Sequence, residues 1–323
     1  MKNVFFSILI PVYKNIDYLE NCLESIIGQN YTDFEVIVCY QGDTEQETKV
    51  RDTRIRNIYL EKPSLYLARK ESYQKSKGDY VLFVDSDDEL LDGALSILQK
   101  TITQNENPDI IQFGYTSRKD VTSSILLSPP KSTMSQEEYL SYFLSELGTY
   151  PIWRKCFKRN DIQFYDEDIF MGEDALFTLA FINRAQKIVS VNETLYFYRL
   201  NAKSGTSNLK SKYLDDLAVF LIHSSPYRKN KREIEMEIYS FICTYFTFRR
   251  TFSARELLSF EHVRIIAHQI ETYSFTTSPK FVKKTFDRNI QLKNCEIVDK
   301  FRLLMLKAMH LFKRDFTVEL QMH

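Results

Sequence analysis

Four acidic side chains follow directly on a short apolar run. The run covers residues 80–84, and the acids are Asp85, Asp87, Asp88 and Glu89. A short, wholly apolar segment between a glycine and a polar cluster predicts a strand that is buried on both faces of a parallel sheet. Ligands of open α/β sheets bind beyond the carboxyl ends of the strands, so these acids lie where a binding site is expected.

Two interpretations of this acidic cluster are open. Crowded carboxylates raise one another's pKa unless a cation lies between them, and a hard divalent cation accepts oxygen ligands from protein and phosphate. Alternatively, the acids cap the helix predicted for residues 90–100, because Asp and Glu in a first turn complement the helix dipole. The stretch by itself supports both interpretations equally.

The composition is that of a globular protein with one large domain and an appendage. The chain has 323 residues, of which 44% are apolar, and this length exceeds one typical domain. No apolar run approaches the roughly 20 residues that cross a bilayer, and the start lacks the cleavage site of a secretory signal. The 5 cysteines lack metal-type spacing, which favours reduced thiols. We therefore expect a cytoplasmic protein.

The charge is distributed unevenly along the chain, although the net charge is zero. Residues 208–323 contain 20 Lys and Arg against 13 Asp and Glu, a net charge of +7, which leaves −7 for residues 1–207. The basic part could face anionic lipid at the inner surface of a membrane, an acidic acceptor or the acidic part of another subunit. A nucleic-acid partner is not expected, because acids interleave with these basic residues and no recognition motif accompanies them.

Apolar segments of strand length alternate with segments of helical periodicity along the first part of the chain. This alternation predicts βαβ units and a doubly wound, mostly parallel α/β sheet, with the last strand at its edge. Gly78 is expected to end the second helix. The predicted strands are residues 5–12, 34–40, 55–61, 80–84, 109–115 and 188–198, and the predicted helices are residues 18–29, 67–77, 92–104, 136–147 and 175–184.

The remainder of the chain has the pattern of an all-helical region, without a glycine from Tyr213 onward. We expect residues 1–207 to form the domain that carries the acidic site, and residues 208–323 to position an acceptor or to self-associate. The apolar helix faces suit internal packing, a homo-oligomer interface or a membrane surface. The predicted helices are residues 214–222, 232–250, 255–273 and 298–312.

Several short motifs occur in a regular order along residues 5–207. They are Ser7-Ile8-Leu9-Ile10-Pro11-Val12-Tyr13-Lys14-Asn15, the predicted helix of residues 18–29, Ala68-Arg69, Gly78-Asp79-Tyr80, Asp85-Ser86-Asp87-Asp88, Trp153-Arg154-Lys155, Gly172-Glu173-Asp174, Tyr196-Phe197-Tyr198-Arg199 and Ser204-Gly205-Thr206-Ser207. In this order they resemble the inverting glycosyltransferases of family 2. The resemblance implies the GT-A nucleotide-diphospho-sugar transferase fold for this part of the chain.

The resemblance also implies a division of roles among the acids. Asp87 is the expected direct ligand of Mn²⁺ or Mg²⁺, Asp85 contacts the ribose or a metal-bound water, and Asp88 is a second candidate ligand. A divalent cation there stabilises the charge that develops on a departing diphosphate. Asp174 is the expected general base, which takes the proton of an acceptor hydroxyl in a single displacement that inverts the anomeric centre.

Other motif residues are expected to bind the nucleotide sugar. Pro11 and Tyr13 belong to the nucleotide loop, and Arg69 belongs to the donor site. Arg199 and Ser204 can offer a charge and a hydrogen bond to the diphosphate.

Trp153 is either a platform for the face of a sugar or a core residue. The basic segment around it, residues 153–159, is also compatible with an exposed amphipathic strand. A further stretch, Cys39-Tyr40-Gln41, departs from the family pattern, which usually has two aspartates and a glycine, the second aspartate reading uracil. Gln41 takes the place of that aspartate, and its amide can still donate and accept hydrogen bonds at a base edge.

These features together predict a metal-dependent, inverting glycosyltransferase. It is expected to move a hexose of the glucose or galactose type from a UDP-sugar to a hydroxyl of a glycan, glycoprotein or lipid-linked acceptor. The altered residues 39–41 leave open a catalytically silent, sugar-binding subunit with the same fold. A nucleotidyltransferase of similar fold is disfavoured, because no glycine-rich loop with Lys or Arg follows the first strand.

Overall fold

The computed structural model describes most of residues 3–272. The chain divides into two compact units, Met1–Ser204 and Gly205–His323. Ser204 and the helix predicted for residues 298–312 lie outside the described residues. Within 3–272, the residues not described are 14–15, 43–46, 118–123, 126–128, 146–148, 166–167, 201–209, 229–233, 235–237, 239–240, 242–243, 246–247 and 249.

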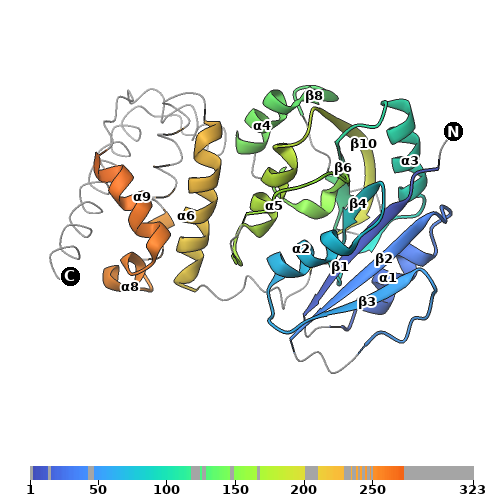
Figure 1. The fold of residues 1–323 in the computed structure, drawn as a ribbon, viewed down its shortest axis with the longest axis horizontal. Coiled ribbons are helices and arrows are strands. Elements are labelled where there is room, and N and C mark those ends of the chain that lie inside the picture. The colour runs from blue at the N-terminus through green and yellow to red at the C-terminus, as the bar shows by residue number, and fades with distance from the viewer. Residues whose placement is uncertain are drawn as a thin grey trace. The chain divides into compact units, whose positions relative to one another are not determined.

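One sheet forms the centre of the first unit (Figure 1). Its strands are β1 Phe6–Tyr13, β2 Phe34–Gln41, β3 Ile55–Leu60, β4 Tyr80–Phe83, β5 Glu89–Leu90, β6 Ile110–Thr116, β7 Ser124–Ile125, β8 Thr133–Ser135, β9 Lys155–Lys158 and β10 Lys187–Phe197. The order is β3-β2-β1-β4-β9-β6-β10-β5, with β7 on β6 and β8 on β10. β1 is parallel to β2 and β4, and β6 is parallel to β10, whereas β9 is antiparallel to β4 and β6. The predicted mostly parallel α/β sheet is therefore confirmed.

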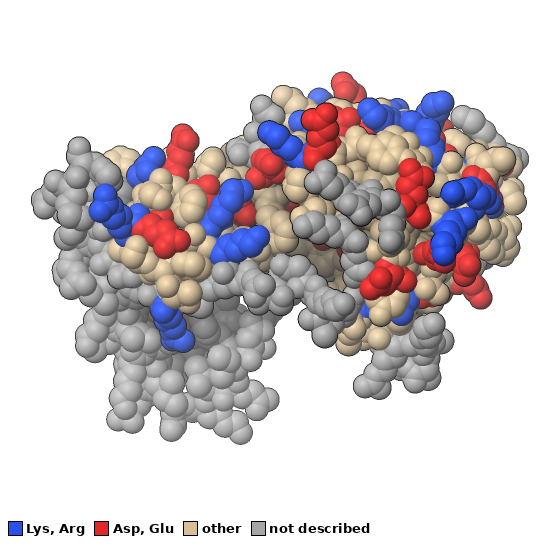
Figure 2. All heavy atoms as spheres, turned by 90° about the horizontal axis from the view of Figure 1, so that it is seen from below, with Lys and Arg blue, Asp and Glu red and all other residues tan. Residues whose placement is uncertain are grey.

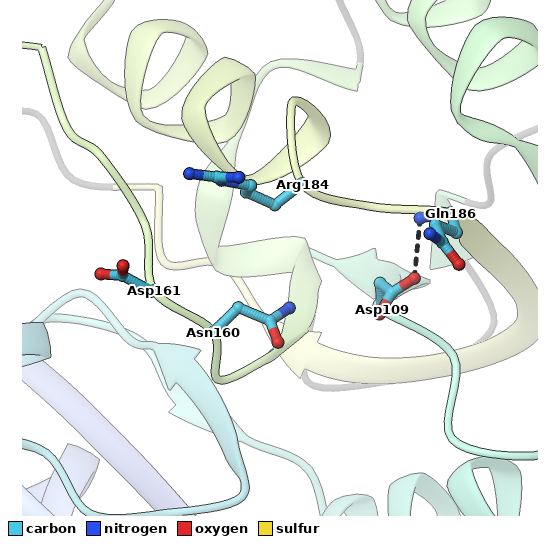
Figure 3. Close-up of a pocket in the computed structure, with 5 residues that line it drawn as sticks. All are labelled: Asp109, Asn160, Asp161, Arg184 and Gln186. Atoms are coloured by element: carbon cyan, nitrogen blue, oxygen red, sulfur yellow. Dashed lines mark hydrogen bonds between the residues drawn. The ribbon is translucent and has the colours of Figure 1, made fainter.

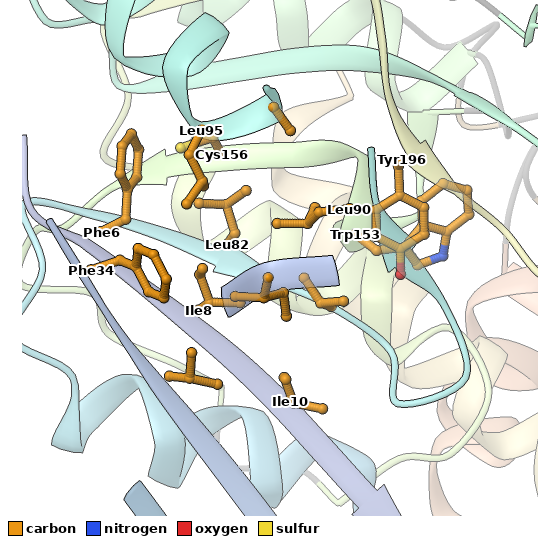
Figure 4. Close-up of a cluster of buried hydrophobic side chains, with 14 of the residues drawn as sticks. Phe6, Ile8, Ile10, Phe34, Leu82, Leu90, Leu95, Trp153, Cys156 and Tyr196 are labelled. Carbon is orange, nitrogen blue, oxygen red and sulfur yellow. The ribbon is translucent and has the colours of Figure 1, made fainter. Parts of the chain in front are cut away.

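Helices pack on both faces of this sheet. Along β1, Phe6, Ile8 and Ile10 belong to an apolar cluster that includes residues of α1 and α3 (Figure 4). On the other face, Phe83 of β4 contacts Phe177 of α5 with ring centroids 5.3 Å apart. Successive strand residues point to opposite faces, so the apolar strands are buried on both. The helices are α1 Leu19–Ile27, α2 Leu65–Lys75, α3 Ala94–Gln104, α4 Gln136–Ser145 and α5 Glu173–Ile182, with a 3₁₀ turn at Ile152–Arg154.

The acids after β4 do not begin a helix. The chain first forms the short strand β5, and α3 then starts at Ala94 behind Gly93, whose φ of 77° is left-handed. The capping interpretation of Asp85, Asp87 and Asp88 is therefore wrong, because strand β5 and a turn separate them from the helix.

Two segments lie deeper in the sheet than the sequence indicates. The predicted edge strand at residues 188–198 is β10, which lies between β6 and β5. The basic segment is likewise not an exposed strand, since Arg154 and Lys155 are buried. Backbone carbonyl groups accept hydrogen bonds from both side chains: Arg154 Nε donates to Phe113 at 3.2 Å, and Lys155 Nζ donates to Pro151 at 2.7 Å. Burial lowers the pKa of Lys155 well below its usual value.

Gly78 has a different role from the predicted one. Helix α2 stops at Lys75, and Ser76 is its C-cap. A Cβ at Gly78 would lie 2.5 Å from the backbone nitrogen of Ser7 and 2.8 Å from the backbone carbonyl carbon of Phe6. Those atoms belong to the backbone of the central strand β1, so moving them aside would cost considerable free energy. A glycine is therefore required for the chain to pass β1 at this point.

We expect Gly78→Ala to lower the free energy of unfolding by about 3 kcal/mol, because the added methyl group overlaps backbone atoms. Urea denaturation followed by circular dichroism measures this loss. Gly93→Ala is the control for the loss of a glycine without overlap: its φ is positive, unlike that of Gly78, but no atom lies within 4 Å of the added Cβ. Its loss should be about 1 kcal/mol. Equal losses for the two variants would show that close approach is not the reason for Gly78.

The second unit contains helices that pack on one another. Asp215 of α6 accepts hydrogen bonds from the backbone N–H groups of His262 and Val263 at 3.0 and 3.2 Å, which ties the start of α9 to α6. The helix predicted for residues 255–273 is interrupted between α8 and α9. No helix within the described ranges is long and apolar enough to pass through a bilayer. The bounds are α6 Lys212–Ser224, α8 Ala254–Leu258 and α9 Glu261–Thr272.

Basic and acidic side chains are interspersed on the part of the surface that is described. On the face drawn in Figure 2, Lys and Arg lie beside Asp and Glu in both units. Many of the basic residues of the C-terminal region fall after residue 272, outside the described ranges. The expectation that this region faces lipid, an acceptor or another subunit stays a prediction.

Candidate active site

The strand directions bring most of the predicted site residues to one edge of the sheet. Tyr13 and Gln41 are paired residues at the carboxyl ends of β1 and β2, and Asp85 follows β4 at the same edge. Because β9 is antiparallel to β4, Trp153 precedes β9 at this edge, and Arg199 follows β10 there. This is the edge at which open α/β sheets bind ligands. The segment Asp85–Glu89 is named the acidic turn below.

Arg69 of α2 joins the acidic turn to the start of α5. Its side chain is 1% exposed, and Nη2 lies 3.1 Å from Asp85 Oδ1. Nη1 donates to Asp174 Oδ1 and lies 3.4 Å from Glu173 Oε1. One buried guanidinium therefore holds carboxylates from two separate elements close together.

Aromatic packing explains why α2 and α5 lie side by side. Phe177 and Phe181 of α5 contact Phe83 and Phe157 of the sheet, and the Phe157 and Phe181 rings stack at 4.1 Å. The same two α5 rings meet tyrosines of α2, Tyr66 with Phe177 and Tyr73 with Phe181, each at 5.3 Å. Such pairs contribute about 0.5–1.5 kcal/mol each beyond their buried area. The packing sets the distance across which Arg69 reaches Asp174.

Burial and crowding change the acid–base properties of this cluster. Burial, and then the charge of Asp174, raise the pKa of Glu173 to about 8, although Arg69 opposes both effects. The pKa of Asp85 is likewise raised to about 6, by burial first and then by the charges of Asp174 and Asp87, against the opposing charge of Arg69. Carboxyl groups held together against desolvation and repulsion are typical of a functional site.

Asp88 and Asp87 differ in what their carboxylates contact. Asp88 Oδ2 accepts the hydroxyl of Tyr196 at 2.7 Å, and Oδ1 accepts the backbone N–H of Arg199 at 2.8 Å. Burial, and then the charge of Asp85, raise the pKa of Asp88 to about 8. The half-buried carboxylate of Asp87, in contrast, makes no hydrogen bond or ion pair with the residues that the structure describes. This contrast favours Asp87 over Asp88 as a ligand of a bound cation.

The donor set suits a divalent cation that is shared with a diphosphate. No group of three or more His, Cys, Asp or Glu side chains is arranged around a metal position within the described part of the chain. Mg²⁺ in phosphate-transfer sites usually takes one or two carboxylates and completes its shell with water and phosphate oxygens. Asp87, with an uncommitted carboxylate, and Asp85 two positions before it fit that requirement. The metal roles of Asp87, Asp85 and Asp88 stay predictions.

Arg199 is attached to the acidic turn. Its Nε donates to the backbone carbonyl of Asp87 at 2.8 Å, and its guanidinium pairs with Glu89. The same guanidinium lies over the ring of Tyr18, 4.4 Å from the centroid. Arg199 therefore organises the turn, and its contact with a diphosphate stays a prediction.

The predicted nucleotide residues lie at the ends of β1 and β2. Pro11 is buried inside β1, opposite Cys39. Tyr13 is 45% exposed and can offer a ring face, whereas Gln41 is 2% exposed. The role of Gln41 in reading a base stays a prediction.

Trp153 has the surroundings of a core residue. It is 7% exposed, and its ring stacks on Tyr196 at 4.7 Å and on Tyr198 at 5.2 Å. Tyr115 meets it edge-on at 4.9 Å. These contacts favour the core interpretation over an open sugar platform.

Two residues of the site have no role assigned from the sequence. Glu173 supplies a third carboxylate that pairs with Arg69, and Tyr196 supplies the hydroxyl that donates a hydrogen bond to Asp88. Both residues belong to motifs of the family resemblance. In the sequence, however, Glu173 is indistinguishable from an acid that caps a helix, and Tyr196 from an ordinary aromatic residue of a strand.

A hollow of about 380 Å³ lies elsewhere on the first unit (Figure 3). Asp109, which precedes β6, accepts the backbone N–H groups of Gln186 and Lys187 at 2.7 and 3.0 Å and so orders the start of β10. These residues are at the amino ends of β6 and β10, away from the acidic turn. The hollow is lined by Asp109, Asn160, Asp161, Arg184 and Gln186.

Comparison with known proteins assigns a family to the first part of the chain. The family model described as glycosyl transferase family 2 matches residues 7–157. This segment therefore belongs to that family. The resemblance drawn from the motifs is therefore confirmed for the part of the chain that carries the acidic turn and Arg69.

Several glycosyltransferases are similar to this chain in sequence. The uncharacterised glycosyltransferase EpsJ of Bacillus subtilis is 27% identical over 216 residues, which are 62% of this chain and 62% of that protein. Glycosyltransferase GlyA of Streptococcus pneumoniae is 27% identical over 215 residues, 61% of this chain and 31% of that protein. The matched part of the chain thus covers less than two thirds of the length of either relative.

The fold also has counterparts among solved structures. The crystal structure of Staphylococcus aureus TarS 1-349 superposes with a TM-score of 0.57 at 19% identity, covering 98% of this chain and 90% of that one. The same protein in complex with UDP-GlcNAc gives a TM-score of 0.56 at 17% identity. At these identities the likeness establishes the fold, which is the expected GT-A fold of family 2 glycosyltransferases.

Proposed function

We propose that the chain is a metal-dependent, inverting glycosyltransferase that uses a UDP-sugar. The observation that carries this proposal is the Arg69 bridge, which holds the acidic turn next to the base candidate Asp174 at the carboxyl edge of the sheet. Support for a uridine donor comes from TarS, whose structures include complexes with UDP-GlcNAc and with UDP.

The side chains of the site suit a single displacement. The acceptor hydroxyl attacks the anomeric carbon, the bond from that carbon to the diphosphate oxygen breaks, and UDP leaves. Asp174 takes the hydroxyl proton on Oδ2, whose contact is the backbone N–H of Ile152 at 3.3 Å, while Arg69 holds Oδ1. Asp87 would hold a divalent cation, which when bound stabilises the charge on the departing diphosphate.

The donor and acceptor are proposed as chemical classes. The donor sugar is a hexose of the glucose or galactose type or, by analogy with TarS, N-acetylglucosamine. The acceptor is a hydroxyl on a glycan, a glycoprotein or a lipid-linked sugar. A cytoplasmic location, contact with the inner face of a membrane and self-association through residues 208–323 belong to the same proposal. Slow hydrolysis of UDP-glucose, UDP-galactose and UDP-GlcNAc with Mn²⁺ would test the donor class.

We expect Asp87→Ala to abolish the manganese-dependent hydrolysis of the preferred UDP-sugar. The reason is that this carboxylate has no other described partner and is the proposed protein ligand of the cation. UDP release with and without Mn²⁺ measures the effect, which should be at least about 100-fold. Asp92→Ala removes an exposed aspartate a few residues away and should leave the rate unchanged. Equal rates for wild type and Asp87→Ala at saturating Mn²⁺ would refute the assignment.

A catalytically silent, sugar-binding subunit is the second candidate. Gln41 favours it, because a neutral and largely buried amide replaces the usual aspartate. This candidate predicts that UDP-sugars bind to the chain but are not hydrolysed or transferred, whichever metal ion or acceptor is added.

A further inference from the structure

We propose that Tyr196 is a positioning residue that sets the acidic turn for the binding of cation and donor. This inference deepens the proposed function and rests on it. Tyr196 lies more than a hundred positions after the turn in sequence and would not contact a substrate itself.

The hydroxyl of Tyr196 joins the first residue of the acidic turn to Asp88. It donates to Asp88 Oδ2 at 2.7 Å and accepts the backbone N–H of Asp85 at 3.1 Å. Asp87 lies between those two residues in the chain. A single oxygen atom therefore binds the backbone before the proposed metal ligand and the side chain of the residue after it.

Tyr196 is itself held firmly. It is fully buried in β10, where it pairs with Leu90 of β5 and Tyr115 of β6. Its ring stacks on Trp153 with centroids 4.7 Å apart and planes 17° apart, at one end of the apolar cluster (Figure 4). The hydroxyl is thus presented by a residue that is paired with strands on both sides and has a packed ring. Precise ligand sites depend on support of this kind.

The residues that follow Tyr196 complete the arrangement. The backbone N–H of Arg199 binds Asp88 Oδ1 at 2.8 Å, and Arg199 Nε binds the carbonyl of Asp87 at 2.8 Å. Both carboxylate oxygens of Asp88 and the backbone of Asp87 are engaged, whereas the carboxylate of Asp87 has no partner among the described residues. The end of β10 thus orders the turn and leaves one carboxylate free for a ligand. Outer groups of this type commonly alter metal affinity by about 10–100-fold.

Tyr196→Phe tests the proposal, because it removes the hydroxyl and retains the stacked ring. Binding of Mn²⁺ to the full chain in the presence of UDP is measured by the electron paramagnetic resonance signal of free Mn²⁺. We expect the dissociation constant for Mn²⁺ to rise about 10-fold or more. Calorimetry measures the affinity for UDP in the absence of metal. This affinity should stay unchanged, since the hydroxyl of Tyr196 contacts the acidic turn and not the nucleotide. Excess Mn²⁺ should restore hydrolysis of the donor.

Tyr115→Phe is the matched control. Tyr115 also packs on Trp153, at 4.9 Å, and its hydroxyl makes no hydrogen bond with the described residues. A second arm places Tyr196→Phe in an Asp88→Ala background, which has no side-chain oxygen for the hydroxyl of Tyr196. If Tyr196 acts through Asp88, its loss should weaken Mn²⁺ binding less there than in the wild type, because the two changes remove one shared contact.

Several results would overturn the proposal. One is an unchanged Mn²⁺ affinity in Tyr196→Phe, and another is an equal loss of metal-free UDP binding, which would indicate a general effect on the fold. If Tyr196→Phe does not fold, Asp88→Ala tests the same contact, and an unchanged Mn²⁺ affinity in that variant would also overturn the proposal. A wild-type chain that binds neither Mn²⁺ with UDP nor a UDP-sugar would instead refute the proposed function.

Discussion

Asp174→Asn is expected to remove nearly all sugar transfer and to leave donor binding intact. Asparagine retains the shape of the side chain and an oxygen for Arg69, but its amide cannot take a proton from the acceptor hydroxyl. Loss of a general base costs about 10²–10⁴-fold in kcat. UDP release from the preferred UDP-sugar gives kcat, and calorimetry gives the affinity for UDP with Mn²⁺.

The neighbouring Glu173→Gln provides the discriminating comparison. Burial, and then the charge of Asp174, raise the pKa of Glu173 to about 8, so a smaller fraction of this group than of an ordinary glutamate is ionised and able to take a proton at neutral pH. Its replacement should lower kcat by about tenfold or less. Asp161→Asn, an exposed aspartate of the same unit, should have no effect. If Glu173→Gln removed transfer and Asp174→Asn did not, the base would be Glu173.

Arg69→Met is expected to have the largest effect on stability. The guanidinium is 1% exposed and faces Asp85, Glu173 and Asp174, so its removal leaves carboxylates close together without a counter-charge. Breaking a buried ion pair by deleting one partner typically costs about 3–5 kcal/mol. For a unit of this size the thermal midpoint should fall by on the order of 10 °C. Differential scanning fluorimetry of the full chain measures the shift.

The same variant should also lose activity beyond the loss of folded protein. Arg69 sets the position of Asp174 relative to the acidic turn, and a displacement of about 1 Å between reacting groups can cost about 100-fold in rate. Arg69→Lys should recover part of the stability but little of the rate, because a single ammonium cannot replace the guanidinium fork.

Arg184→Met is the control for Arg69→Met, since Arg184 is exposed and its side chain has no described ion pair. It should keep both the midpoint and the rate. A midpoint for Arg69→Met equal to that of Arg184→Met would show that the buried bridge does not contribute to stability.

Much of the fold was predictable because its signals are local. The short apolar runs identified β1, β2 and β4, and the helical spacing identified α1 and α5, since periodicity depends only on neighbours in the chain. The start of α3 was not predictable in this way. The acids before it resemble a cap, and only pairing with β10 draws residues 89–90 into a strand.

The basic segment before and within β9 shows a second limit of local signals. Arg154 and Lys155 have the composition of a surface strand, yet β9 lies between β4 and β6. Backbone carbonyls of Phe113 and Pro151 accept hydrogen bonds from these side chains and make their burial possible. Such partners come from other parts of the chain, so the sequence of the segment itself does not reveal them.

Apolar periodicity and the order of motifs along the chain predict the fold class, the family and the two acidic segments that form the candidate site. The contact of Arg69 with both segments, and the lack of a described partner for the carboxylate of Asp87, depend on residues that only folding brings together. The reason is physical: Asp88 is engaged by Tyr196, 108 positions away in sequence, which the parallel pairing of β10 with β6 carries to the acidic turn.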